Sequence, residues 1–236
     1  MRFLCLHGLG CNADIFEAQT AQIREQLGDS HTFDFPEGEY DIPAPKEITA
    51  IYPPPYLSWH PPHTLDTHIA QGLLDIRTYI ADNGPYDACL GFSQGAVMLA
   101  LLLLEDSAAS LKSANSNGSS TNGSSNASST PHSLPFQLAI FLSGSLYPFA
   151  IPLLSLGAQI NIPTTHVWGG KRDYVTTNGA GEALRDACAA EGRVVVEHGE
   201  GHVVPRGGGG VRAVVGGWRR GLGGRYIRVR YGGEGD

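Results

Sequence analysis

The sequence predicts an α/β fold, in which a mostly parallel β-sheet is covered by helices on both faces. Short apolar runs typical of buried strands alternate with longer segments whose apolar residues recur at helical spacing. The 236 residues suffice for one domain with its own core, and their 42% hydrophobic share is ordinary for a globular protein. The formal net charge of −7 argues against nucleic-acid binding, because no basic surface would attract phosphates.

The N-terminal part predicts a strand, a helix and a second strand. Residues 2–7 are apolar enough for a buried strand, and Asn12 can cap a helix that ends at Gly28. The second strand is expected at residues 31–35. Residues 36–63 contain eight prolines. Because proline lacks an amide donor, this segment predicts a long loop on the substrate side of the fold.

The middle of the chain repeats the alternation and then becomes low in complexity. Thr64 can cap a helix that stops before Gly84, and a strand at 86–92 and a helix at 95–105 follow. Eleven of the 27 residues at 107–133 are serine. Such a stretch cannot bury enough apolar area to offset the entropy of ordering it, so we expect a disordered insertion.

Regular structure is expected to resume with strands at 136–142, 164–168 and 193–197. A helix over 181–190 precedes the last of them. Residues 1–206 would thus form a single α/β domain.

The remaining residues, 207–236, differ in composition. Twelve of the 30 are glycine and six are arginine, and we find no apolar periodicity of a closing amphipathic helix. We expect a disordered tail, with an error in the reading frame of the gene model as the alternative.

The sharpest local motif is Gly-Phe-Ser-Gln-Gly at residues 91–95, which matches the G-x-S-x-G pattern of a nucleophile elbow. Its glycines allow a strand to turn sharply into a helix, so that the serine hydroxyl projects above the sheet edge. The pattern alone is weak, but an apolar strand precedes it and an apolar helix follows. Ser93 is therefore the candidate nucleophile.

A serine hydroxyl needs a base and an orienting acid at neutral pH, and in this architecture the acid and then a histidine follow the serine. Three histidines lie well past the motif: His166, His198 and His202. His166 falls inside a predicted strand. His202 lies in a glycine-flanked loop after the last strand, and we prefer it to His198. Asp173 follows a strand at the carboxyl edge of the sheet and is the candidate acid.

An oxyanion hole requires two backbone N–H groups directed at the developing charge. One normally belongs to the residue after the nucleophile, here Gln94. The other is expected from the glycine-rich loop after the first strand, and Leu9 is our candidate.

Together these segments resemble the FSH family of serine hydrolases. The resemblance rests on residues 4–12 with Ile15, Phe16 and Gln19, on residues 91–96, on Asp173 and on residues 201–205. It covers residues 2–206 without the serine-rich insertion. It implies a compact α/β hydrolase that cleaves carboxylic esters or thioesters, with Ser93, Asp173 and His202 as the triad. It also implies a closing helix after the histidine loop, which the tail composition does not predict.

The substrate side is less well defined. Residues 56–59 resemble the aromatic segment of the family's substrate loop, which makes Tyr56 and Trp59 candidate contacts, although simple packing of the loop is the alternative. An alkyl chain would suit a pocket lined by Leu9, Leu146, Phe149 and Val203. Several fungal members release polyketide chains from a carrier protein, so a thioesterase of secondary metabolism is one alternative to a general esterase.

Two other functions are open. Residues 8–13 fit a G-x-G-x-x-A dinucleotide loop, with Asp34 near the offset for a ribose contact, but this leaves the elbow unexplained. The other is an inactive binding protein on the same fold.

We expect no cofactor, no metal and no nucleic-acid partner, and a small-molecule or carrier-bound acyl substrate. No membrane span is expected, because the longest apolar run, 97–104, is about half of what a bilayer requires. Free buried cysteines and a cytoplasmic location complete the expectation.

Overall fold

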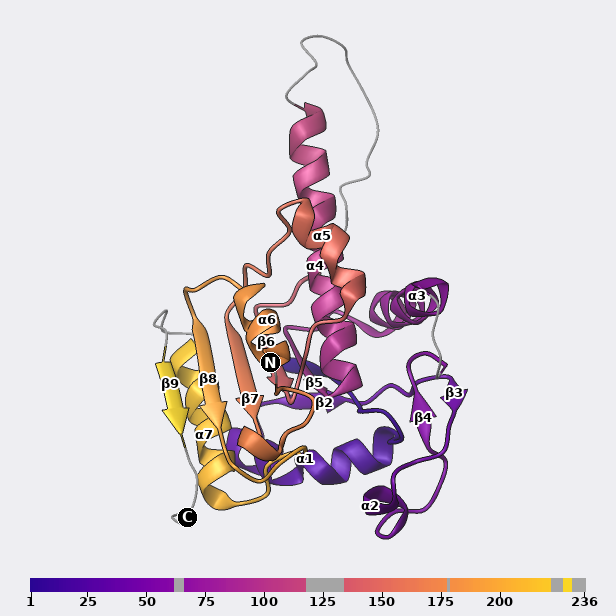
Figure 1. Cartoon of the computed structure of the whole chain (residues 1–236), viewed down its shortest axis with the longest axis vertical. Helices are drawn as coiled ribbons and strands as arrows, with labels where there is room; N and C mark the ends of the chain where they lie inside the picture. Colours follow the sequence, from indigo (N-terminus) through magenta and orange to yellow (C-terminus); the bar gives the residue numbers. More distant parts are fainter. Residues whose placement is uncertain (62–65, 118–133, 178, 222–226, 231–236) are drawn as a thin grey trace.

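A seven-stranded parallel sheet forms the centre of the molecule (Figure 1). The computed structural model describes residues 1–61, 66–117, 134–177, 179–221 and 227–230. The strand order is β2-β1-β5-β6-β7-β8-β9, and every neighbouring pair runs parallel. The strands are β1 (Arg2–Leu6), β2 (Thr32–Asp34), β5 (Ala88–Phe92), β6 (Leu138–Leu142), β7 (Thr164–Trp168), β8 (Arg193–Glu197) and β9 (Ile227–Arg230).

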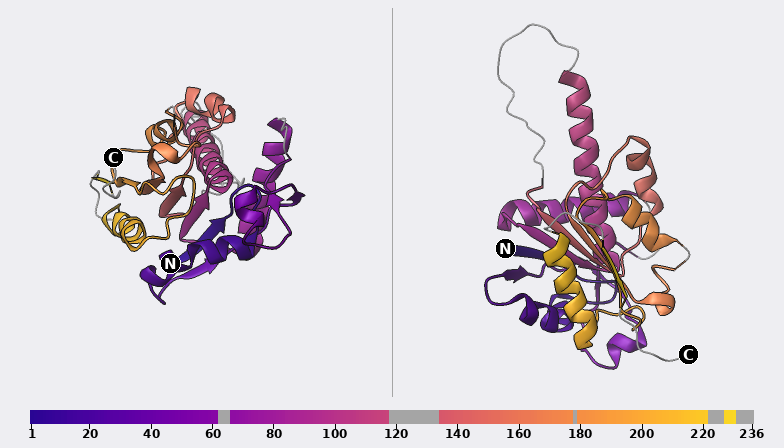
Figure 2. Two further views of the ribbon diagram at one scale, coloured as in Figure 1. Left: turned by 60° about the horizontal axis from the view of Figure 1, so that its bottom comes forward. Right: turned by 90° about the vertical axis from the view of Figure 1, so that its left-hand side faces the viewer.

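Helices cover both faces of the sheet (Figure 2). Because side chains alternate along a strand, Leu4 and Phe3 of β1 belong to different halves of the core. One half packs against α1 (Ala13–Leu27) and α7 (Gly208–Gly221). The other packs against α3 (Asp66–Asn83), α4 (Gln94–Asn117), α5 (Ile151–Ser155) and α6 (Ala180–Asp186). The predicted fold class is confirmed.

The boundaries of α1 follow from its capping residues. The Asn12 side chain accepts a hydrogen bond from the Ile15 N–H at 2.8 Å, and Gly28 ends the helix with a φ of 90°. Both residues act as the sequence predicts. The observed bounds of β7 and β8 likewise equal the predicted ones.

The proline-rich segment is more ordered than a plain loop. It contains two short antiparallel strands, β3 (Tyr40–Asp41) and β4 (Leu57–Ser58), and a one-turn helix, α2 (Lys46–Thr49). The segment also bridges to the main domain, because Leu57 pairs with Cys11. The predicted cap Thr64 lies outside the described residues.

Helix α4 is longer than the predicted helix at 95–105. It continues to Asn117 through residues expected to be disordered, because alanine and leucine favour a helix there and Ala108 is buried. Residues 118–133 of the predicted insertion lie outside the described part of the chain. Of the described helices, only α4 is long and apolar enough to cross a membrane, and 67% of its most apolar stretch is buried inside the fold.

The prediction of a disordered tail is wrong for α7 and β9, because α7 packs into the core and β9 pairs with β8 at the edge of the sheet. Val211, Val214 and Val215 stand at i, i+3 and i+4 and form a narrow buried face. Small residues allow α7 to approach closely, since a Cβ at Gly217 would lie 3.0 Å from Val194 Cγ1. This valine face was missed because glycines and arginines surround it.

Candidate active site

Ser93 lies in the sharp turn between β5 and α4. Its φ of 52° is unusual for a residue with a side chain, and its N–H donates to the Leu142 carbonyl at 2.9 Å. The flanking glycines are required by close packing. A Cβ at Gly91 would lie 2.6 Å from the Ala96 nitrogen, and one at Gly95 would lie 2.2 Å from the Leu6 carbonyl oxygen. The motif therefore has the strand–turn–helix context of a nucleophile elbow.

Ser93, His202 and Asp173 are joined in series by two hydrogen bonds. His202 Nε2 lies 3.0 Å from Ser93 Oγ, and His202 Nδ1 lies 2.8 Å from Asp173 Oδ1. Asp173 follows the 3₁₀ turn η2 (Gly170–Arg172) after β7, and His202 lies in the loop between β8 and α7. Parallel strands bring these loops to one sheet edge although Ser93 and His202 are 109 residues apart.

The two other histidines past the motif take other positions. His166 is fully buried in β7, where its Nε2 lies 3.1 Å from Thr164 Oγ1. His198 lies at the end of β8, and its Nδ1 accepts the Glu200 N–H at 3.3 Å. The histidine bonded to Ser93 is thus the one that the sequence favours, and it was identifiable because it follows Gly201 in the loop after the predicted last strand.

Asp173 is fully buried and lies among hydrogen-bond donors. Burial by itself would raise the pKa of its carboxyl group, but the hydrogen bonds from His202 and from the Gly169 N–H lower that pKa to about 2. The carboxylate is therefore ionised at neutral pH. It accepts a hydrogen bond from the Nδ1–H of His202, so Nε2 is left to accept the hydrogen bond of the Ser93 hydroxyl.

The two candidate oxyanion donors come from the start of α4 and from the turn after β1. Gln94 is the first residue of α4, and Leu9 lies in the turn between Gly8 and Cys11, where the Cys11 N–H donates to the Gly8 carbonyl at 3.2 Å. Within the described chain, neither the Leu9 nor the Gln94 N–H donates to another backbone group. Both residues line the same cavity as Ser93.

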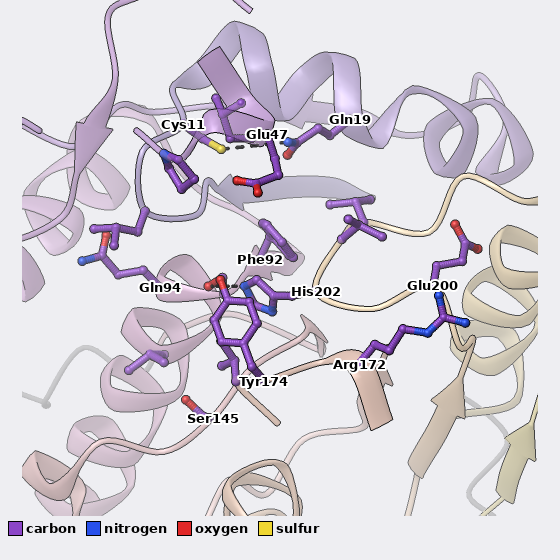
Figure 3. A pocket seen from close by; sticks show the side chains of 18 of the residues that line it. Cys11, Gln19, Glu47, Phe92, Gln94, Ser145, Arg172, Tyr174, Glu200 and His202 are labelled. Atoms are coloured by element: carbon purple, nitrogen blue, oxygen red, sulfur yellow. Dashed lines mark hydrogen bonds between the residues drawn. The ribbon is translucent and has the colours of Figure 1, made fainter. Parts of the chain in front are cut away.

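That cavity has a volume of about 830 Å³ and is lined by Ser93 together with His202 and Gln94; Figure 3 shows how the labelled lining residues lie around it. One wall comes from α2 and the residues after it, and Glu47 belongs to it. Sequence reasoning did not identify its apolar and aromatic members, Ile48, Ile51 and Tyr52. Their spacing at i, i+3 and i+4 was the signal that could have found them. Tyr174 faces His202 with a ring-centroid distance of 4.7 Å, and Arg172 and Glu200 lie on the side away from Gln94 (Figure 3).

The predicted substrate residues divide into two groups. Leu9 and Val203 line the cavity, whereas Tyr56, Trp59, Leu146 and Phe149 are not among its described lining residues. Tyr56 donates its hydroxyl to the Tyr52 carbonyl, and Leu146 and Phe149 pack against the core. Trp59 is only 4% exposed, and its indole N–H donates to the His7 carbonyl. These contacts belong to the packing of the loop and the core, and a substrate contact for the four residues stays a prediction.

The fold and this site define an α/β hydrolase of the serine type. Solved structures with the same fold include Arabidopsis thaliana SOBER1, with a TM-score of 0.57 and 17% identity over 94% of this chain and 99% of that one. Esterase PE8 has a TM-score of 0.55 and 16% identity, covering 93% of this chain and 91% of its own. At such identities the likeness concerns the fold alone.

Residues 1–213 match the family model described as serine hydrolase (FSH1), and the chain belongs to this family. Esterase FPY3 of Fusarium mangiferae is 33% identical over 87% of this chain and 89% of its own length. Hydrolase phiM of a fungal species is 28% identical over 86% of each chain. The protein is therefore an enzyme that hydrolyses ester bonds. The family match ends at residue 213, within α7.

Proposed function

We propose that Ser93 is the nucleophile of a two-step hydrolysis of a carboxylic ester or thioester. His202 is the general base and acid, Asp173 orients the imidazole, and the Leu9 and Gln94 N–H groups bind the oxyanion. The observation that carries this proposal is the continuous hydrogen-bonded series from Asp173 through His202 to Ser93. Ser93 and His202 line a cavity together with Leu9 and Gln94, whose N–H groups have no backbone acceptor within the described residues.

The chemistry follows from this geometry. Ser93 Oγ attacks the substrate carbonyl carbon while His202 Nε2 takes the hydroxyl proton. The tetrahedral oxyanion then collapses and expels an alcohol or thiol, which receives that proton from His202. Water attacks the acyl-enzyme in the second step and gives a proton to His202. The carboxylic acid leaves as this proton returns to Ser93.

A fluorophosphonate probe tests the nucleophile directly, because it phosphonylates only an activated serine. We expect stoichiometric labelling of the folded wild-type protein, and peptide mapping should place the label on Ser93 rather than on Ser145, another serine that lines the cavity. Ser93→Ala should abolish both labelling and turnover of a short p-nitrophenyl ester. An unlabelled, folded wild type would instead support an inactive binding protein on this fold.

We further propose that the acyl group is hydrophobic. Leu9, Ile51, Tyr174 and Val203 line the cavity while each stays at least 37% exposed, which leaves apolar area for a substrate to cover. A series of p-nitrophenyl esters from two to twelve carbons measures this preference. We expect kcat/KM to rise with chain length, and a maximum at two carbons would contradict a hydrophobic acyl group.

The leaving group is the second unknown. N-acetylcysteamine thioesters of the same acyl chains imitate the end of a carrier-bound substrate. A higher kcat/KM for these than for matched alkyl esters would support release of an acyl chain from a carrier protein, as the resemblance suggests. The reverse order would favour a small-molecule ester as substrate.

A further inference from the structure

One short segment of the proline-rich region, residues 57–60, contacts both halves of the proposed oxyanion hole. Its backbone is joined to the turn that contains Leu9. The Gly10 N–H donates to the Leu57 carbonyl at 2.9 Å, and the Leu57 N–H donates to the Cys11 carbonyl at 2.8 Å. The two residues that follow Leu9 are therefore fixed by β4.

The residues before Leu9 are fixed by Trp59 of the same segment. Its Nε1–H donates to the His7 carbonyl at 2.8 Å, and its ring lies against the His7 ring with a centroid distance of 4.7 Å. His7 itself is fully buried, and its Nε2 accepts the Gly38 N–H at 2.9 Å. The turn that presents the Leu9 N–H is thus held on both sides by residues 57–60.

The second donor belongs to Gln94, whose side-chain amide also binds this segment. Its Nε2 donates to Ser58 Oγ at 3.0 Å and to His60 Nε2 at 3.0 Å, and its Oε1 accepts the Trp59 N–H at 3.1 Å. The orientation is consistent, because His60 Nδ1 lies 3.1 Å from the Pro61 carbonyl and so bears the proton, which leaves Nε2 as an acceptor. The side chains of Gln94, Ser58, Trp59 and His60 are all buried.

We propose that Ser58 and Trp59 are positioning residues that set the two oxyanion donors relative to each other, an inference that rests on the proposed function of Ser93. Residues 57–60 are not among the described residues that line the cavity. They reach the reaction only through Gln94 and the turn at Leu9. Their loss should therefore weaken binding of the transition state and leave binding of the substrate unchanged.

The experiment compares Ser58→Ala and Trp59→Phe with a matched control. Thr20→Val removes another buried hydroxyl, which donates to the Phe16 carbonyl at 2.8 Å within α1 and is not among the described lining residues of the cavity. We would measure kcat and KM for a p-nitrophenyl ester, and Ki for a trifluoromethyl ketone with the same acyl chain, below the melting temperature of each variant. The ketone forms a tetrahedral adduct whose oxygen occupies the oxyanion hole.

Removal of one oxyanion donor typically costs about 10²–10³ in rate, so displacement of a donor should cost about 10–100-fold. We expect kcat to fall by this factor in both variants, KM to change less than threefold, and Ki for the ketone to rise by the same factor as kcat falls. Thr20→Val should retain the wild-type kcat and Ki.

Two outcomes would overturn this inference and leave the proposed function standing. In the first, the wild type is active and both variants keep its kcat. In the second, KM rises in the variants while kcat and Ki stay constant, because residues 57–60 would then act on substrate binding. A folded wild type without turnover or labelling would overturn the proposed function itself.

Discussion

Replacement of Asp173 by asparagine tests whether its carboxylate orients the His202 imidazole. Asparagine has the same shape but presents an amide, which can donate to His202 and favour the wrong imidazole tautomer. We expect Asp173→Asn to lower kcat by about 10³–10⁴ while KM changes little. Ester turnover by the purified variant would measure kcat and KM, and circular dichroism would show that the variant is folded. A folded variant with near wild-type kcat would show that His202 does not depend on this carboxylate.

The candidate triad was predictable because it depends on chain order and on loop position. Ser93 has its glycines, and Asp173 and His202 each follow a strand at the same sheet edge. The substrate contacts were not predictable in the same way. Trp59 belongs to a segment that resembles an aromatic substrate loop, yet its indole N–H donates to the carbonyl of the buried His7. Only the packed fold determines which side of a loop faces the cavity.

Substitutions in helix α7 test whether the C-terminal segment stabilises the domain. Val214 is fully buried against the sheet, whereas Arg212 on the same helix is exposed. A charged side chain at a buried apolar position lacks a partner, so we expect Val214→Asp to lower the free energy of unfolding by about 3 kcal/mol or more. Urea denaturation would measure this. Arg212→Ala should stay within about 0.5 kcal/mol of wild type. An unchanged urea midpoint for Val214→Asp would mean that α7 does not dock on the sheet.

The elements predicted well are those with strong local signals. Asn12 and Gly28 delimit α1, and β-branched residues, which favour strands, make up three of the five residues in each of β7 and β8. Helix α7 was missed because the valines and alanine of its buried face stand between glycines, and glycine has a low helix propensity. Its formation depends on tertiary burial against β7, β8 and α1, and a sequence pattern cannot show that burial.

Buried histidines should make the stability of the entire fold depend on pH. Burial lowers the pKa of His7 to about 4. Burial, with the positive charge of Arg193 nearby, lowers the pKa of His166 to about 3. In the unfolded chain both rings titrate near pH 6.5. Below that pH the unfolded state binds protons that the native state does not, so stability is fully present above about pH 6.5 and is lost as the pH falls toward the folded values.

His166 allows this dependence to be measured without touching the catalytic edge, since its ring lies in the sheet beside Phe141 at a centroid distance of 5.3 Å. Each such histidine lowers the free energy of unfolding by up to about 1.4 kcal/mol for each pH unit by which the pH falls below about 6.5. Replacement of His166 by phenylalanine removes one titrating group and keeps an aromatic ring. We expect the free energy of unfolding, measured in urea at pH 7.5, 6 and 5, to fall less steeply in His166→Phe than in wild type, whatever its absolute stability. Equal slopes for the two proteins would mean that the His166 ring gains its proton without unfolding, and that the acid sensitivity of the fold arises elsewhere.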